Sequence, residues 1–237
     1  MRRPMPGRAD RAVAVVIPAY QAAATIADVV ARTSRAVSGA TVYVVDDGSA
    51  DGTGDAGRGA GANVLVHPRN RGKGAALGTG LAAALGAGAG VIVTLDADGQ
   101  HPPEAIPRLV RLVLDRVADL VLGARARTTA MPFGRRWTNG LSDALASRIG
   151  GIRVPDAQTG FRALSRRAAE GVRPAEQGYD FETAFLLEAL AQGLPVASVP
   201  VPTIYAGQSS HFRPWHDTWR QVRVFTRYGR KAIFGAR

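Results

Sequence analysis

The sequence predicts an α/β fold in which helices flank a mostly parallel sheet. Two observations lead to this prediction. Short apolar runs rich in β-branched residues alternate with segments of helical spacing through the first half of the chain. Acidic or glycine-containing turns follow directly after several of these runs, at the positions where open α/β sheets bind ligands. The alternation therefore indicates a doubly wound sheet.

The first two strands and the helix between them are clear in the sequence. An apolar strand is expected at Val13–Ile17, followed by helical spacing from Ala22 to about Val37. Thr41–Val45 is the second strand, and a glycine-rich stretch leads to a third at Asn63–His67. No G-x-G-x-x-G motif follows the first strand, so the usual dinucleotide fingerprint is absent.

The middle of the chain continues the same alternation. A fourth strand is expected at Val91–Leu95, a helix at Pro103–Arg116 and a fifth strand at Asp119–Leu122. The strongly basic section Ala124–Pro155 shows no clear strand. A later helix is expected from Asp180 to about Gln192, where the acids at its start are also good capping residues.

Composition limits the possible sites. The chain of 237 residues has no cysteine, which excludes disulfides and thiolate metal sites. The uncharged stretch Gly74–Leu95 is broken by Gly86–Gly90, so it indicates helix, turn and strand and no membrane span. No apolar segment accompanies the basic Met1–Arg11, so we expect no signal peptide and a cytoplasmic location.

The charge of the chain indicates anionic partners. The formal net charge is +11, and Lys73 and Lys231 are the only lysines among its basic residues. Nucleic acid, an anionic membrane face and phosphorylated substrates are the candidate partners.

Two aspartates follow the fourth strand. Residues i and i+2 of an extended segment point the same way, so Asp96 and Asp98 can aim at one point beyond the strand. Two carboxylates there repel each other unless a cation or a proton lies between them, and oxygen ligands suit Mg²⁺ or Mn²⁺. For a D-x-D pattern taken alone, a turn with helix-capping acids is the alternative.

Polar groups follow two other strands as well. Asp46 and Asp47 come after the second strand and can accept hydrogen bonds from a ribose or a base. Gly72-Lys73-Gly74 lies beyond the third strand at a helix start, where free N–H groups and a cation suit phosphate. Each pattern alone also fits an ordinary turn or loop. Together, on one sheet edge, they predict a nucleotide-diphosphate site with a metal.

Several ordered motifs resemble a known family. They are Val-Ile-Pro-Ala-Tyr (16–20), Val-Val-Asp-Asp-Gly-Ser (44–49), Arg-Gly-Lys-Gly (71–74) and Asp-Ala-Asp-Gly-Gln-His-Pro-Pro-Glu (96–104). The chain is similar in these motifs to the family 2 glycosyltransferases, which have the Rossmann-like GT-A fold. Asp-Leu-Val-Leu-Gly-Ala-Arg (119–125), Asp-Ala-Gln-Thr-Gly-Phe-Arg (156–162) and Gly-Tyr-Asp-Phe-Glu (178–182) resemble the dolichyl- or polyprenyl-phosphate sugar synthases. The resemblance runs from about Val13 to Tyr205.

The resemblance implies roles for individual residues. The expected donor site comprises Pro18, Tyr20, Asp46, Asp47, Lys73 and Ala97. The expected ligands of an Mg²⁺ or Mn²⁺ ion that bridges the donor diphosphate are Asp96, Asp98 and Gln100. The expected contacts of the acceptor phosphate are Arg125, Arg135 and Asn139. Asp156 and Arg162 join Asp96 and Asp98 as expected catalytic residues.

The end of the chain has a distinct pattern. Apolar residues recur between Trp215 and Ile233, and basic residues fall on an arc roughly 100° wide by helical geometry. A basic amphipathic helix of this kind is typical of binding to an anionic membrane surface. The alternative is a terminal helix that packs on the body of the protein. We expect a catalytic domain at 1–205, followed at 206–237 by a site-closing loop and this helix.

The expected reaction is the transfer of a hexose, with inversion, from GDP-mannose or a UDP-hexose to polyprenyl or dolichyl monophosphate. A phosphate monoester has a second pKa of about 6, so it is already a strong anion near neutral pH and needs no general base. We expect the enzyme to lie on the inner face of the membrane, and a membrane-embedded partner protein is a further possibility.

Two alternatives stay open. A hydroxyl acceptor would require a carboxylate base, for which Asp156 and Asp180 are the candidates. A nucleic-acid-binding module is suggested by the charge alone, and it leaves the carboxylate clusters unexplained. We therefore expect no nucleic acid among the partners.

Overall fold

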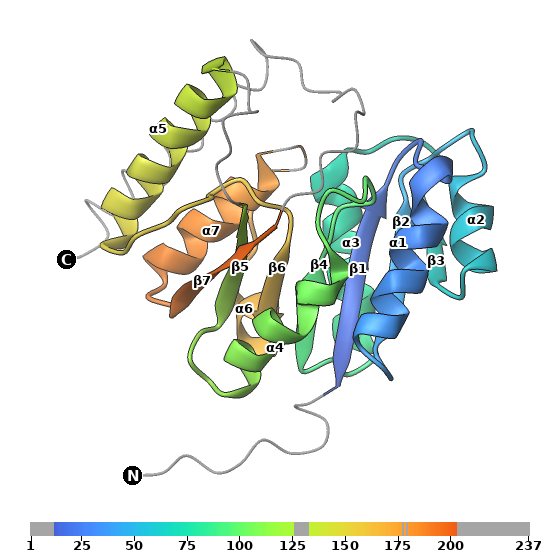
Figure 1. Cartoon of the computed structure of the whole chain (residues 1–237), viewed down its shortest axis with the longest axis horizontal. Coiled ribbons are helices and arrows are strands. Elements are labelled where there is room, and N and C mark those ends of the chain that lie inside the picture. Colours follow the sequence, from blue (N-terminus) through green and yellow to red (C-terminus); the bar gives the residue numbers. More distant parts are fainter. Residues whose placement is uncertain (1–11, 126–132, 177, 179, 203–237) are drawn as a thin grey trace.

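The fold is built on one seven-stranded sheet (Figure 1). The computed structural model describes residues 12–125, 133–176, 178 and 180–202, and the side chains of 133–139 and 141 lie outside the described part. Across the sheet the strands follow the order β3-β2-β1-β4-β6-β5-β7. Their bounds are β1 Val13–Ala19, β2 Thr41–Asp46, β3 Asn63–Val66, β4 Val91–Thr94, β5 Leu120–Arg125, β6 Arg162–Ser165 and β7 Val196–Val201.

The sheet is mostly parallel, as the sequence predicts. β1 pairs in parallel with β2 and with β4, β2 with β3, and β5 with β7. β6 is the exception, because it runs antiparallel to both of its neighbours, β4 and β5. The start of β6 therefore lies beside the end of β4, with Arg162 opposite Thr94.

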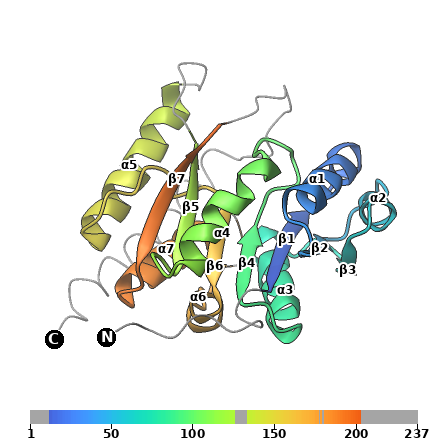
Figure 2. The ribbon, with the colours of Figure 1, turned by 60° about the horizontal axis from the view of Figure 1, so that its bottom comes forward.

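Helices cover both faces of the sheet (Figure 2). Their bounds are α1 Ala23–Ala36, α2 Thr53–Gly59, α3 Lys73–Gly86, α4 Ile106–Leu114, α5 Phe133–Gly150, α6 Arg166–Gly171 and α7 Phe181–Ala191, with a 3₁₀ turn at Pro103–Ala105. One apolar core joins the sheet to α1 and α4, and a second joins it to α3, α6 and α7. β1 serves both cores: Val15 and Ile17 belong to the first, and Ala14 and Val16 to the second, as the alternation of a strand requires.

The structure adds elements that the sequence pattern does not reveal. α5 occupies most of the basic section for which no strand is expected, and β6 and β7 complete the far side of the sheet. The single helix expected at Pro103–Arg116 is a 3₁₀ turn followed by the shorter α4. The amphipathic helix expected near the end of the chain lies outside the described residues.

None of the helices in the described part of the chain combines the length with the apolar composition that crossing a membrane requires.

Glycines let α3 pack closely against the sheet. A Cβ atom built on Gly80 would lie 2.2 Å from Cγ1 of Val16 in β1, whereas one on Gly78 in the same helix meets nothing within 4 Å. We expect Gly80→Ala to lower the free energy of unfolding by about 1–3 kcal/mol, because it overpacks the core. Gly78→Ala is the matched control and should stabilise by up to about 1 kcal/mol through helix propensity. Urea unfolding measures both, and equal effects of the two variants would contradict the packing argument.

Candidate active site

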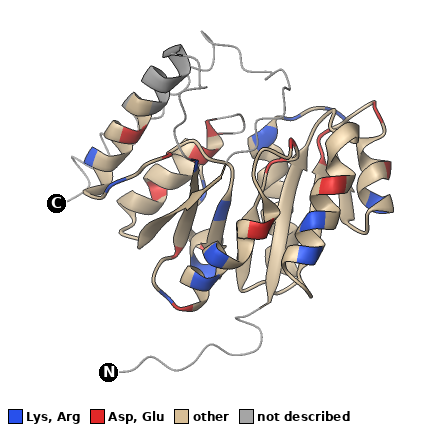
Figure 3. Ribbon diagram, viewed as in Figure 1, with Lys and Arg blue, Asp and Glu red and all other residues tan. Residues whose placement is uncertain are grey.

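The candidate site lies at the carboxyl edge of the parallel strands. The chain moves from β1 outward to β2 and β3 and then returns to β4 on the other side of β1. Such a reversal opens a crevice beyond the strand ends, where α/β proteins bind ligands. Acidic and basic residues meet at this edge (Figure 3).

A partly buried lysine joins two carboxylates there. Lys73 is the first residue of α3, and its Nζ lies 2.7 Å from Oδ1 of Asp96 and 2.6 Å from Oε1 of Glu182. Burial alone would lower the pKa of Lys73, but the charges of Asp96 and Glu182 outweigh it and raise that pKa well above its usual value. The lysine is therefore firmly charged.

The same cluster keeps Asp96 ionised. Burial would raise the pKa of this carboxyl, but the charge of Lys73, with smaller contributions from His101 and Arg125, lowers it overall. The sequence predicts Lys73 and Asp96 in one site, and the structure brings them into direct contact. Glu182, which the sequence places at a helix start, is a third member.

Asp98 lies beside this cluster, and its pKa is shifted in the opposite direction from that of Asp96. Its pKa is raised by burial and by the negative charge of Asp96, and its Oδ1 accepts a hydrogen bond from the backbone N–H of Gln100. A divalent cation between Asp96 and Asp98 would offset the repulsion of the two carboxylates, and carboxylate oxygens suit Mg²⁺ or Mn²⁺. Asp96 and Asp98 thus have the chemistry that a metal requires, and Gln100, the third predicted ligand, follows them in the same loop.

The protein supplies only part of the coordination of such a metal. Within the described residues, no group of three His, Cys, Asp or Glu side chains could hold a metal ion. Mg²⁺ is commonly held by one or two carboxylates together with substrate phosphates and water. The site therefore suits a metal that arrives with, or is completed by, a diphosphate.

Asp96 is held against a glycine turn. A Cβ atom added to Gly160 would lie 2.5 Å from Oδ1 and 2.6 Å from Oδ2 of Asp96. The Thr94 hydroxyl, at the end of β4, donates to the Gly160 carbonyl over 2.7 Å and holds this turn in place. The turn just before β6 therefore forms the floor beneath the Asp96 carboxylate.

The expected donor residues lie at the ends of β1, β2 and β4. Tyr20 is 46% exposed and follows β1, in which Pro18 is buried. Oδ1 of Asp46 accepts from the Ser49 N–H over 2.9 Å. The Ala97 carbonyl accepts from the Thr25 hydroxyl over 2.7 Å, which ties the loop after β4 to α1.

Asp47 faces the interior, unlike Tyr20. Its side chain is buried, and its carboxylate accepts from His67 Nδ1 over 2.6 Å, Arg71 N over 2.9 Å and Gly72 N over 2.8 Å. These contacts hold the loop before α3, and the donor contact predicted for this side chain stays a prediction.

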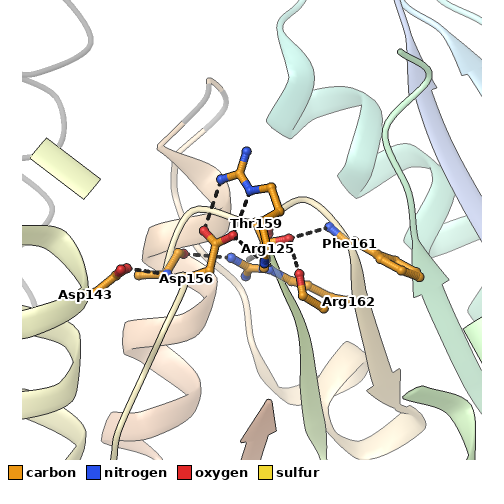
Figure 4. A network of polar contacts seen from close by, with 8 residues as sticks. Arg125, Asp143, Asp156, Thr159, Phe161 and Arg162 are labelled. Carbon is orange, nitrogen blue, oxygen red and sulfur yellow. Dashed lines mark hydrogen bonds and ion pairs between the residues drawn. The ribbon is translucent and has the colours of Figure 1, made fainter. Parts of the chain in front are cut away.

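Arg125 and Asp156 form an ion pair with each other (Figure 4). Arg125 Nε lies 2.7 Å from Asp156 Oδ2, and Nη2 donates to Oδ1 over 3.1 Å. The sequence predicts Arg125 for the acceptor phosphate and Asp156 for catalysis, and the two lie together at the end of β5. The side chains of Arg135 and Asn139, the other predicted acceptor contacts, belong to α5 but lie outside the described part.

Arg162, a predicted catalytic residue, is bonded to the backbone around the site. Its guanidinium is buried and donates to the backbone carbonyls of Thr159, Glu182 and Ala157 over 2.8, 2.6 and 3.0 Å (Figure 4). These bonds join the Gly160 turn to the start of α7. The catalytic role expected for Arg162 stays a prediction.

Helix α5 anchors the loop that carries Asp156. Asp143 accepts from the Ala157 N–H over 2.7 Å, and Ser147 accepts from the Val154 N–H over 2.8 Å. Nothing in the sequence pattern reveals these contacts, because a buried Asp and a Ser in a helix have no distinctive spacing. They fix the loop from both sides of Asp156.

Three buried polar atoms near the site have no hydrogen-bond partner within the described residues. One is Oε1 of Glu182, which instead forms the ion pair with Lys73. The others are Oδ1 of Asp180, at the start of α7, and Nδ1 of His101, whose ring lies 5.5 Å from that of Phe161. Burial lowers the pKa of His101 despite the opposing charge of Asp96. The lowered pKa favours the neutral form of the His101 imidazole.

The chain matches the family described as glycosyl transferase family 2 over residues 14–173. This span runs from β1 to just past the end of α6 and includes Lys73, Asp96, Asp98 and the Arg125–Asp156 pair, whereas Glu182 lies beyond it. The chain belongs to glycosyl transferase family 2. It is a glycosyltransferase, and the family predicted from the motifs is confirmed.

Named relatives cover most of the chain. An undecaprenyl-phosphate mannosyltransferase of Micrococcus luteus is 31% identical over 201 residues, which are 80% of this chain and 82% of that protein. A polyprenol monophosphomannose synthase of Mycolicibacterium smegmatis is 30% identical over 203 residues, with 79% and 75% covered.

The fold has a solved counterpart. Glucosyl-3-phosphoglycerate synthase of Mycobacterium tuberculosis, in complex with Mn²⁺, UDP and glucosyl-3-phosphoglycerate, superposes with a TM-score of 0.73 at 25% identity. The match covers 98% of this chain and 86% of that one. The predicted GT-A fold is confirmed by this likeness and by the mostly parallel sheet.

A substitution in the Gly160 turn tests whether activity depends on the position of the Asp96 carboxylate. We expect Gly160→Ala to reduce turnover roughly 100-fold, because a displacement of about 1 Å at a reacting group costs that much and the new methyl would occupy the place of the Asp96 carboxylate. Nucleoside diphosphate release measures the effect.

Gly171→Ala is the matched control, because its nearest neighbour outside α6 would be Gln192 Oε1 at 3.5 Å, an ordinary contact. Gly160→Ala should remain folded by circular dichroism. Full activity of Gly160→Ala would show that the position of Asp96 is unimportant.

Proposed function

We propose that this glycosyltransferase transfers a hexose, with inversion, from GDP-mannose or a UDP-hexose to polyprenyl or dolichyl monophosphate. The observation that supports this most is the placement of a charged Lys73 between Asp96 and Glu182, next to the Arg125–Asp156 pair. This arrangement places one basic side chain, Lys73, where the donor diphosphate would bind, and another, Arg125, where the acceptor phosphate would bind.

On the donor side, Asp96, Asp98 and Gln100 would hold Mg²⁺ or Mn²⁺, which offsets the charge of the departing nucleoside diphosphate when bound. Lys73 lies against Asp96 and at the start of α3, where N–H groups and the helix dipole favour a phosphate. Tyr20 and Asp46 would contact the nucleoside from the ends of β1 and β2.

On the acceptor side, Arg125 would bind the lipid phosphate, and Arg135 and Asn139 of α5 would assist it. The pairing of Asp156 with Arg125 supports this assignment, because a carboxylate that already accepts two guanidinium N–H groups is a poor general base. A phosphate nucleophile needs no base. The relatives named for undecaprenyl phosphate and polyprenol support the same acceptor class.

A hydroxyl acceptor is the second candidate. Two observations favour it: the fold likeness to glucosyl-3-phosphoglycerate synthase, and the unpartnered Oδ1 of Asp180, which is the remaining carboxylate predicted as a base. In this case a phosphorylated hydroxy acid such as phosphoglyceric acid would take the hexose, and Asp180 would remove the hydroxyl proton.

The test is nucleoside diphosphate release with Mg²⁺ or Mn²⁺, scanning GDP- and UDP-sugars with a short polyprenyl phosphate, with phosphoglyceric acid or with neither. We expect release that depends on the lipid phosphate and that Asp98→Ala reduces roughly 100-fold, because a metal ligand is lost. Asp115→Ala is the control, because it removes an exposed carboxylate that pairs with Arg111 on α4.

Release that depends on phosphoglyceric acid and is lost in Asp180→Asn would favour the second candidate. Lipid-dependent release that Asp180→Asn leaves intact would contradict it. Release that ignores both acceptors would contradict both.

We further propose that the enzyme binds the surface of an anionic membrane, where its lipid acceptor resides. The net charge of +11 and the basic, aromatic pattern of residues 215–233 support this. The protein should sediment with vesicles that contain anionic lipid, and binding should weaken as salt rises because the attraction is screened. Equal binding to neutral vesicles would argue against the proposal.

A further inference from the structure

A buried histidine stands behind the Lys73 loop. His67 follows β3 directly and is 5% exposed. With the proton on Nδ1, its imidazole donates to Oδ1 of Asp47 over 2.6 Å, and Nε2 accepts from the Thr79 hydroxyl of α3 over 3.0 Å. One side chain thus links the ends of β2 and β3 to the helix that begins with Lys73.

The partner of this histidine fixes the loop itself. The two oxygens of Asp47 hold two consecutive backbone N–H groups, Arg71 N over 2.9 Å and Gly72 N over 2.8 Å. Gly72 has a φ of +95° and directly precedes Lys73. A carboxylate that binds successive amides restricts the direction in which the chain enters the helix.

The loops at the ends of β2 and β3 are also in backbone contact. A Cβ atom on Gly48 would lie 2.6 Å from the carbonyl carbon of Arg69 and 2.8 Å from the N of Asn70. The nucleoside-binding turn after β2 and the loop before α3 therefore form one unit, with the His67–Asp47 pair inside it.

We propose that His67 is a positioning residue for the donor diphosphate. It acts through Asp47, whose carboxylate holds the amides of Arg71 and Gly72 and so presents Lys73 and the start of α3 to the phosphates. The inference rests on the proposed function, because it assigns the diphosphate of the nucleotide sugar to this helix start.

A matched pair of substitutions isolates the contact. His67→Asn keeps an amide donor near the position of Nδ1, within reach of Asp47. His67→Gln moves that amide to the position of Nε2, toward Thr79, so Asp47 loses its donor while the site stays polar. His67→Leu removes both contacts. It replaces His67→Gln as the test if the longer Gln side chain folds back to bond Asp47.

The readout is calorimetric binding of GDP and UDP with Mn²⁺, compared with guanosine and uridine. We expect His67→Gln and His67→Leu to bind the diphosphate roughly tenfold more weakly, the effect of one charge-assisted hydrogen bond. Nucleoside affinity should stay unchanged, and His67→Asn should behave like the unaltered protein. In a Lys73→Met background the His67 substitutions should have no further effect.

A purely structural histidine would give other results. It would lower the thermal midpoint and leave the ratio of diphosphate to nucleoside affinity unchanged, as expected for Thr33→Val, which removes a buried hydrogen bond within α1. If folded His67→Gln and His67→Leu keep the ratio of diphosphate to nucleoside affinity unchanged, the inference about His67 is overturned and the proposed function is not affected. Failure of the unaltered protein to bind either diphosphate would overturn the proposed function, and the inference with it.

Discussion

The ion cluster of Lys73, Asp96 and Glu182 is the interaction on which the organisation of the site depends. It brings together three segments that are far apart in the sequence: the start of α3, the loop after β4 and the start of α7. A buried carboxylate without a counter-charge is costly, so each member of the cluster needs the others. The surrounding contacts can be understood as means of keeping these three charges in place.

Those contacts come from both sides. Behind Lys73, Asp47 and His67 fix the loop that enters α3. Beneath Asp96, the Gly160 turn leaves room for the carboxylate. Beside Glu182, the Arg162 guanidinium bonds both the Gly160 turn and the first turn of α7, and so holds the two together. The acceptor side connects through the loop of Asp156, which α5 anchors. The predicted donor and acceptor residues are therefore connected through one backbone segment, residues 156–162.

The sequence predicts the first half of the fold well because its strands are apolar, rich in β-branched residues and followed by turns. It does not predict β6, because Arg162–Ser165 is a four-residue strand containing an arginine and a serine, and its existence depends on partners on both sides. For the same reason, the carboxyl edge and its aspartates could be predicted, but the orientation of single side chains could not. Asp46 and Asp47 are adjacent, chemically identical and both buried, and only the turn geometry decides that the first bonds Ser49 and the second bonds His67 and the loop before α3.

The reversed direction of β6 has a consequence for how substrate choice can change. In a purely parallel sheet, the loops at the carboxyl edge all follow strands. Because β6 runs the other way, the segment leading into it also arrives at this edge, beside the end of β4. The proposed nucleotide half of the site would thus be built by loops that leave β1 to β4, and the proposed acceptor half by the segment between β5 and β6. Insertions or replacements in that one segment could redirect the enzyme to a new acceptor while the nucleotide half keeps its own scaffold.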